Sequence, residues 1–272
     1  MKKKRVIPVL LLKNGWLVQS KGFKRHQNLG NPITAVKRLS EWASDEIIYL
    51  DISREEKYDL RRDDLGNPNK RIFLGIIEEV SKVTFMPITV GGRIRTIDDM
   101  RKRFSVGADK ISINTAALES RELISEAAKE FGAQAVVISV DAKIVDGEYR
   151  VFSKGGTFDT KLGPKEWAKE AEERGAGEIL LNSIDRDGAK TGYDLELLSQ
   201  VSESVKIPVV ALGGVGEWSH LAEALDKTEV DAVAAANIFN YTDQSVFFAK
   251  KYLFEKGYNI RPPELLEVSI NK

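Results

Sequence analysis

The most regular feature of the chain is a series of short apolar runs separated by longer, charged stretches. The runs are rich in Val, Ile, Leu and Ala, and they recur at intervals of roughly 25 to 40 residues. Continuous apolar runs are typical of parallel strands that are buried on both faces, and longer segments between them supply the crossovers. The pattern therefore predicts eight strands, at residues 5–12, 46–52, 86–91, 109–113, 134–141, 178–183, 207–212 and 231–236.

The segments between these runs have the pattern of amphipathic helices. Asn31-Pro32 has the chemistry of a helix start, and the helical stretches 122–133 and 164–177 both end in a region that contains glycine. Eight strand-helix units favour a closed (β/α)8 TIM barrel over an open, doubly wound sheet. We expect one barrel domain over residues 1–272.

The chain also repeats itself at half its length. Residues 6–15 align with 136–147, residues 86–94 with 207–216, and residues 107–117 with 230–239. Pro87 and Pro208 each stand five residues before an aligned glycine, Gly92 and Gly213. This favours a barrel of two fourfold halves. The alternative is that all buried barrel strands resemble one another.

One charged segment, 54–71, interrupts the pattern after the second predicted strand, and its Gly66-Asn67-Pro68 sequence is typical of a turn. In a barrel the loops after strands lie on the catalytic face. The insertion is therefore either a lid or docking element beside the active site, or a solvated surface excursion.

Composition narrows the chemistry. The 41 basic and 41 acidic side chains cancel, so bulk charge gives no indication of nucleic acid or an anionic membrane as a partner. The chain has no cysteine, and its two histidines, His26 and His220, are far apart, which argues against a metal site or a serine-histidine triad. We expect a cytoplasmic enzyme without a cofactor, whose acid-base chemistry depends on carboxylates.

Three motifs carry a resemblance to a known family: VDAK (140–143), GADKISINTAA (107–117) and GAGEILLNSIDRDGAKTGYD (175–194). In order and spacing the chain resembles the cyclase subunit of imidazole glycerol phosphate synthase, from Arg5 to about Leu253. The resemblance implies a barrel that binds a bisphosphate ribonucleotide and takes ammonia from a glutaminase subunit on its N-terminal face. It also implies lyase and cyclase chemistry in histidine biosynthesis.

The resemblance places only one of two catalytic carboxylates. Asp141 matches the family's acid, whereas Leu11 occupies the position of the second aspartate. The internal repeat shows the same asymmetry, because it aligns Leu11 with Asp141. Leucine cannot transfer a proton, so ordinary cyclisation should be impaired unless another carboxylate substitutes. A purely structural Asp141, paired with Lys143 or capping a loop, is the alternative.

Two anion sites are expected at glycine turns and short helix N-termini. Gln19 replaces a lysine of the family, with Lys21 close by, and Arg93 stands where the repeat puts Gly214. One site is complete and the opposite one is altered by Arg93. The residues concerned are Asp187, Gly188, Gly213, Gly214, Ala236 and Asn237 in the first, and Arg93, Asn114 and Thr115 in the second. The glycines could instead be structural.

At the opposite end of the barrel, the family's ammonia gate matches this chain at four charged positions: Arg5, Glu46, Lys110 and Glu178. Each lies at or just before the start of a predicted strand, where two basic and two acidic side chains can pair completely. Asp109 matches a residue that faces the glutaminase, and Thr89 and Ser112 are expected along the passage. A simple plug at the barrel bottom is the alternative.

The gate residues are retained, whereas the C-terminal, catalytic face of the barrel is altered. This combination favours a relative of the cyclase over the cyclase itself. The pattern resembles paralogues that work with a glutaminase and a sugar amidotransferase in surface-polysaccharide biosynthesis, where acetamido groups become acetamidino groups. We expect ammonia to pass to such an amidotransferase on the C-terminal face. The alternatives are an authentic cyclase whose base has moved, for example to Asp51, and a non-catalytic activator of the glutaminase. A phosphosugar isomerase relative would not need the gate.

Overall fold

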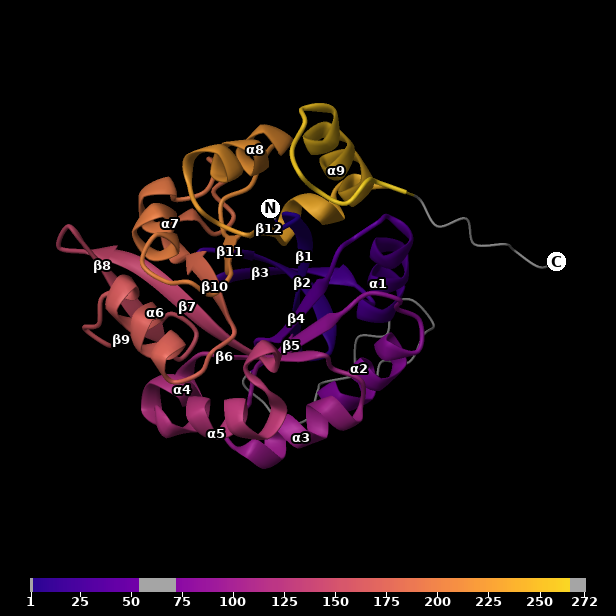
Figure 1. Ribbon diagram of the computed structural model, residues 1–272. Coiled ribbons are helices and arrows are strands. Elements are labelled where there is room, and N and C mark those ends of the chain that lie inside the picture. Colours follow the sequence, from indigo (N-terminus) through magenta and orange to yellow (C-terminus); the bar gives the residue numbers. More distant parts are fainter. Residues whose placement is uncertain (1, 54–71, 265–272) are drawn as a thin grey trace.

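Eight parallel strands form a closed barrel in the computed structural model, which describes residues 2–53 and 72–264. Each strand pairs with its neighbour in the chain, and the last pairs with the first. Seen along the barrel, the strands ring a central axis (Figure 1). They are β1 (Arg5–Lys13), β4 (Ile47–Asp51), β5 (Ile88–Gly91), β6 (Lys110–Ile113), β7 (Val136–Val145), β10 (Glu178–Ser183), β11 (Val209–Leu212) and β12 (Ala232–Ala235). The predicted TIM barrel is confirmed, and the predicted insertion 54–71 lies outside the described residues.

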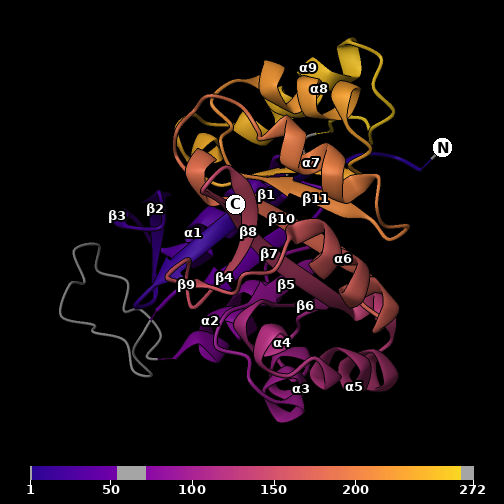
Figure 2. The same cartoon turned by 90° about the vertical axis from the view of Figure 1, so that its left-hand side faces the viewer.

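Helices surround the barrel and cover the outer faces of the strands (Figures 1 and 2). Within the described part of the chain, none is long and apolar enough to cross a membrane. They are α1 (Pro32–Glu41), α2 (Phe73–Ser81), α3 (Ile97–Ser105), α4 (Thr115–Glu119), α5 (Glu122–Phe131), α6 (Pro164–Glu173), α7 (Leu195–Ser202), α8 (Trp218–Lys227) and α9 (Ser245–Glu255).

The helix boundaries follow the expected capping chemistry. The Asn31 side chain accepts hydrogen bonds from the backbone N–H groups of Ile33 and Thr34, so α1 begins at Pro32 as predicted. Helix α5 ends before Gly132, which has a φ of 87°. Helix α6 ends at Glu173, short of the predicted range 164–177, because Gly175 reverses the chain with a φ of 102°.

The strands read as continuous apolar runs because both of their faces are buried. Their outward residues pack against the helices in the main core. Their inward residues form a second, smaller apolar cluster inside the barrel, made of Ile7, Val9, Ile48, Val137, Leu180, Val210, Leu212, Ala232 and Ala234. The barrel is therefore a packed body whose chemistry is confined to its two ends.

Two β-hairpins extend the equivalent strands of the two halves. Strand β1 continues into β2 (Trp16–Lys21) and β3 (Arg25–Gly30), and β7 continues into β8 (Glu148–Ser153) and β9 (Phe158–Asp159). Both hairpins turn on two residues with positive φ, Asn14-Gly15 and Asp146-Gly147, as a type I′ turn requires. This matching extension agrees with the half-barrel repeat.

Candidate active site and barrel floor

Four charged side chains meet at the N-terminal mouth of the barrel in a closed ring of ion pairs. Arg5 contacts Glu46 and Glu178 at 2.5 Å each, through its two terminal nitrogens. Lys110 Nζ contacts the second oxygens of the same glutamates at 2.9 and 3.0 Å. Each charge thus has two partners of opposite sign. The four residues matched in the sequence come together, and their role as an ammonia gate stays a prediction.

The ring keeps its charges although it is largely shielded from water. Burial opposes the charge on Arg5, but the Glu178 and Glu46 carboxylates outweigh it and hold the pKa of the guanidinium above its ordinary value. Burial likewise opposes ionisation of Glu46, and the charges of Arg5 and Lys110 lower the pKa of that carboxyl. Since mutual pairing sustains the charged state, removal of one member leaves the others poorly compensated.

The residues predicted along the passage and at the partner face lie on, or just before, two neighbouring strands, β5 and β6. Thr89 and Ser112 are buried on β5 and β6, and Ser112 Oγ has no hydrogen-bond partner among the residues that the structure describes. Asp109 is exposed at the mouth, and its Oδ2 accepts a hydrogen bond from Ile88 N at 2.8 Å. Asp109 can therefore face a partner while it also fixes the start of β5.

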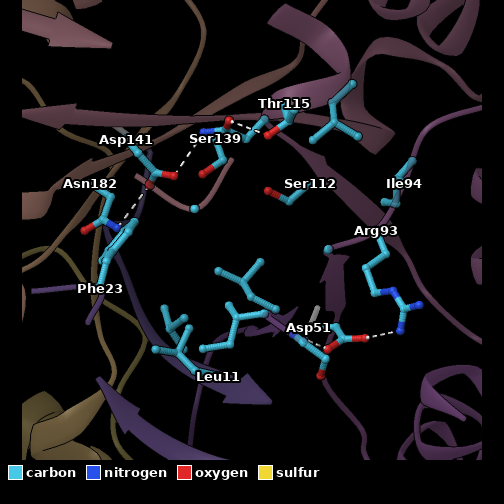
Figure 3. Close-up of a pocket in the computed structure, with 18 of the residues that line it drawn as sticks. Leu11, Phe23, Asp51, Arg93, Ile94, Ser112, Thr115, Ser139, Asp141 and Asn182 are labelled. Carbon is cyan, nitrogen blue, oxygen red and sulfur yellow. Dashed lines mark hydrogen bonds and ion pairs between the residues drawn. The ribbon is translucent and has the colours of Figure 1, made fainter. Parts of the chain in front are cut away.

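A cavity opens at the other end of the barrel, where the strands have their carboxyl ends, and Asp141 from β7 lines it. The Asp141 carboxyl accepts hydrogen bonds from Asn114 Nδ2 at 3.0 Å and from Asn182 Nδ2 at 3.2 Å. Figure 3 shows Asp141 and Asn182 on one side of the cavity and Asp51 and Arg93 on the other. Asp141 makes these two bonds and no ion pair with Lys143 among the described residues, and both amide donors lie at the ends of neighbouring strands.

Desolvation raises the pKa of the Asp141 carboxyl to about 7. The hydrogen bond from Asn182 opposes this shift, and the negative charge of Asp187 adds to it. A carboxyl group that titrates near neutral pH can both donate and accept a proton at the working pH of a cell. Asp141 therefore has the properties of a general acid-base group.

Leu11 provides no second proton-transfer group. It lies on β1 opposite Val18 of β2 and Leu50 of β4. It packs at the upper edge of the interior apolar cluster with Leu50 and Ala236. The part of the cavity wall that β1 contributes, across from Asp141, is accordingly apolar (Figure 3).

The first predicted anion corner lies at the ends of β10, β11 and β12. Gly188, Gly213, Gly214, Ala236 and Asn237 line the cavity there. A Cβ at Gly214 would lie 2.1 Å from the carbonyl oxygen of Gly192, so only glycine allows this close backbone approach. The Asp187 carboxylate accepts hydrogen bonds from Ser20 Oγ at 2.7 Å and Phe23 N at 3.0 Å, which ties the β2–β3 hairpin to this corner.

The second predicted anion corner lies across the barrel, at the ends of β5 and β6. Arg93 adopts a left-handed φ of 57°, and its Nη1 lies 3.8 Å from Asp51 Oδ2. Thr115 Oγ1 accepts a hydrogen bond from Lys154 N at 2.9 Å, and Asn114 is bound to Asp141. The side chains at this corner are thus already engaged in the protein's own contacts.

Asn182 is a site residue that the sequence reasoning missed. It is the penultimate residue of β10 and pairs with Asp141 of β7, and a polar residue near the carboxyl end of a buried strand was the available signal. Within residues 2–53 and 72–264, no group of three or more His, Asp or Glu side chains is placed to hold a metal ion. The cavity therefore offers the carboxyl groups of Asp141, Asp187 and Asp51, the guanidinium of Arg93, amide donors and backbone N–H groups as its chemical equipment.

Comparison with known proteins gives consistent matches over nearly the whole chain. Residues 5–245 match a family described as "Histidine biosynthesis protein". A chain named imidazole glycerol phosphate synthase subunit HisF from Saccharolobus solfataricus is 42% identical over 261 residues, which cover 96% of this chain and 100% of that protein. The subunit of the same name from Sulfurisphaera tokodaii is 41% identical over the same shares. Neither name refers to sugar modification.

Proposed function

The chain belongs to the histidine biosynthesis protein family and is HisF-like, and on that premise we propose that it is the ammonia-using barrel subunit of a glutamine-dependent enzyme of the imidazole glycerol phosphate synthase type. In this proposal a glutaminase subunit docks at the N-terminal mouth. Ammonia enters past the ring of Arg5, Glu46, Lys110 and Glu178, and it is used at the Asp141 end.

The observation that carries the proposal is the closed ring of ion pairs. A barrel that needed only a plug could use apolar side chains, which avoid the cost of desolvating four charges. Charges that pair completely keep water and ions out of the mouth, yet they can separate in concert when a partner binds. Ammonia passes as the neutral molecule, since an ammonium ion would be costly to move through the apolar interior. The complete pairing of the four charges therefore supports a gate over a plug.

For the reaction itself, the names of the relatives make imidazole glycerol phosphate synthesis the first candidate. Asp141 would exchange protons with the reacting ligand, and the two corners would hold its phosphates. Asp51 is a poor substitute for the missing base, because its side chain is fully shielded from solvent and is paired with Arg93. The β1 side of the site, at Leu11, contributes no proton.

Leu11 favours a second candidate for the destination of the ammonia. A barrel that lacks one of two carboxylates can still conduct ammonia to a separate acceptor, such as a sugar amidotransferase on the C-terminal face. The comparisons give this candidate no support, and it rests on the site alone. The insertion 54–71, which would be its docking element, lies outside the described residues.

A direct assay separates the two candidates. The purified chain is mixed with an ammonium salt and the bisphosphate ribonucleotide, and release of the aminoimidazole product is followed. If the chain is the cyclase subunit, product forms and Asp141→Asn abolishes it. Binding of a glutaminase without product formation excludes the first candidate.

Coupling to a glutaminase tests the shared part of the proposal. The chain is combined with a glutaminase subunit, and glutamine hydrolysis is compared with and without the barrel. Lys110→Met should disturb the coupling, whereas Lys102→Met, on an exposed pair with Asp98, should leave it unchanged. If the barrel neither binds the glutaminase nor changes its rate, the proposal is wrong.

A further inference from the structure

The two anion corners of the cavity are built differently, although the sequence repeat makes them equivalent. They end β5 and β11, which lie four strands apart and hence on opposite sides of the barrel. Gly213-Gly214 have φ values of 100° and 99°, and Gly92-Arg93 have 95° and 57°. The backbone turn is therefore similar at both corners. The corner at β5 carries the guanidinium of Arg93, whereas the corner at β11 has glycine, with no side chain, at the equivalent position.

The backbone turn at Gly92 and Arg93 is fixed by its contacts with the end of β4 and with Arg103. A Cβ at Gly92 would lie 2.1 Å from the carbonyl oxygen of Asp51, so the turn rests directly on the end of β4. The carbonyl oxygen of Gly92 accepts a hydrogen bond from Nη2 of the buried Arg103 at 2.8 Å. Arg93 thus projects from a fixed point at the cavity edge.

The side chain of Arg93 is positioned by a carboxylate that the solvent does not reach. Asp51 has no side-chain exposure, and its Oδ1 accepts a hydrogen bond from Ser53 N at 2.9 Å. The Arg93–Asp51 separation of 3.8 Å is longer than the 2.5–3.0 Å contacts within the ring of four charges at the N-terminal mouth, called the floor ring below. Arg93 keeps 28% of its side chain exposed in the cavity, so the pair orients the guanidinium without enclosing it.

The left-handed backbone conformation of Arg93 also indicates that its side chain has a function. A left-handed conformation costs a residue with a Cβ about 1 kcal/mol or more, and glycine would adopt it freely. The chain therefore keeps a side chain at a strained position on the cavity edge. A guanidinium there is suited to an anion, because its planar fork of donors matches phosphate and carboxylate oxygens.

We infer that the side chain of Arg93 binds the second anionic group of a ligand that carries one such group at each end. Asp51 is the positioning residue of Arg93. At the opposite corner, backbone N–H groups bind the anion instead of a side chain. The first phosphate lies at Gly213 and Gly214, and the second anionic group contacts the guanidinium of Arg93. The inference rests on the proposed function for the ligand having two anionic ends. It makes Arg93 the residue that determines specificity at the β5 end.

Inorganic phosphate is the probe, and equilibrium dialysis at fixed ionic strength counts the phosphates bound per chain. The unaltered protein should bind two. Arg93→Met should weaken one of them by about 10- to 100-fold, as expected for a lost charge-assisted hydrogen bond, and leave the other unchanged. Arg93→Lys should keep part of the affinity. Arg95→Met is the matched control, since Arg95 is an exposed arginine of the same cavity, and it should change neither site.

Asp51→Asn tests the positioning role. It should weaken only the phosphate at the β5 corner, whereas a general loss of structure would weaken both. Arg93→Gly removes the backbone strain and so keeps the fold. If Arg93→Gly binds the second phosphate as tightly as the unaltered protein, or if the unaltered protein binds one phosphate or none, the inference is overturned. Because the measurement needs neither ammonia nor a glutaminase, its failure is separate from failure of the coupling assay.

Discussion

Replacement of Lys110 by methionine is the most direct perturbation of the floor ring. The variant keeps a long side chain and removes the one cation that joins the second oxygens of Glu46 and Glu178. Only 20% of the lysine side chain is exposed, with 10% and 7% for the two glutamates. Loss of one partner from a buried ion pair costs about 3–5 kcal/mol. We expect about 3 kcal/mol, because Arg5 still contacts both carboxylates.

This loss should depend on pH in a defined direction. The pKa of Glu46 is lowered in the folded protein from 4.5, so Glu46 contributes stability above the unfolded value, and this contribution disappears as the pH falls through the folded pKa. Lys110→Met removes part of that contribution. The variant should therefore be clearly less stable at pH 7 and approach the unaltered protein below about pH 4.

Thermal unfolding followed by circular dichroism between pH 3 and 8 measures both effects. For a chain of this size, about 3 kcal/mol lowers Tm by roughly 6–12 °C. Lys102→Met removes a comparably short contact, 2.6 Å to Asp98, but both of its side chains are more than half exposed, so its Tm should not change. A loss of Tm in Lys110→Met that is equal at pH 3 and pH 7 would refute the reasoning.

Three further perturbations probe the upper face. Leu11→Asp places a second carboxyl group opposite Asp141 and should raise formation of the aminoimidazole product by about 10²–10⁴-fold if the cyclase candidate is correct, measured with ammonium as nitrogen source. Asp141→Asn removes a group whose folded pKa of about 7 lies above its unfolded 3.8, so the unaltered protein should lose up to about 4 kcal/mol of stability relative to this variant between pH 4 and pH 7, measured by denaturant unfolding. Gly214→Ala forces a Cβ to within 2.1 Å of Gly192 O and should weaken phosphate binding at that corner while the Arg93 corner keeps its affinity, measured by equilibrium dialysis.

The barrel could be predicted closely because its strands are buried on both faces. The observed bounds of all eight strands lie within a few residues of the apolar runs, and β10 matches its run at both ends. The largest deviation occurs at the C-terminal end of β7, which extends beyond the barrel into a hairpin, as β1 also does. A hairpin arm that leaves the core needs only one apolar face, so continuous runs do not reveal it.

The hairpins nevertheless had a local signal. Asn14-Gly15 and Asp146-Gly147 are the dipeptides preferred in type I′ turns, and each stands between two segments of strand character. No strands were predicted over these segments, because a short hairpin does not follow the longer strand-helix period. Their contacts with the site, such as those of Ser20 and Phe23 with Asp187, were therefore not predicted.

The site was less predictable than the fold because its properties depend on contacts between distant strands. The raised pKa of Asp141 results from burial by several elements, and no spacing in the sequence encodes it. The pairing of Arg93 with Asp51 joins the ends of two neighbouring barrel strands, β4 and β5, which a long segment of chain separates. By contrast, charges at the starts of four buried strands already required mutual pairing, because no other partner is available inside a barrel mouth.

The same energetics explain why the two ends of this barrel can change independently. A floor charge has two partners, so replacement of one member leaves an uncompensated charge, and the ring can be retained or lost only as a unit. Upper-face residues are less interdependent. Leu11 is stabilised by apolar contacts with Leu50, and the charge of Arg93 is balanced locally by Asp51. The site at the C-terminal end can therefore acquire new ligand contacts one residue at a time while the ring of charges at the N-terminal mouth stays unchanged.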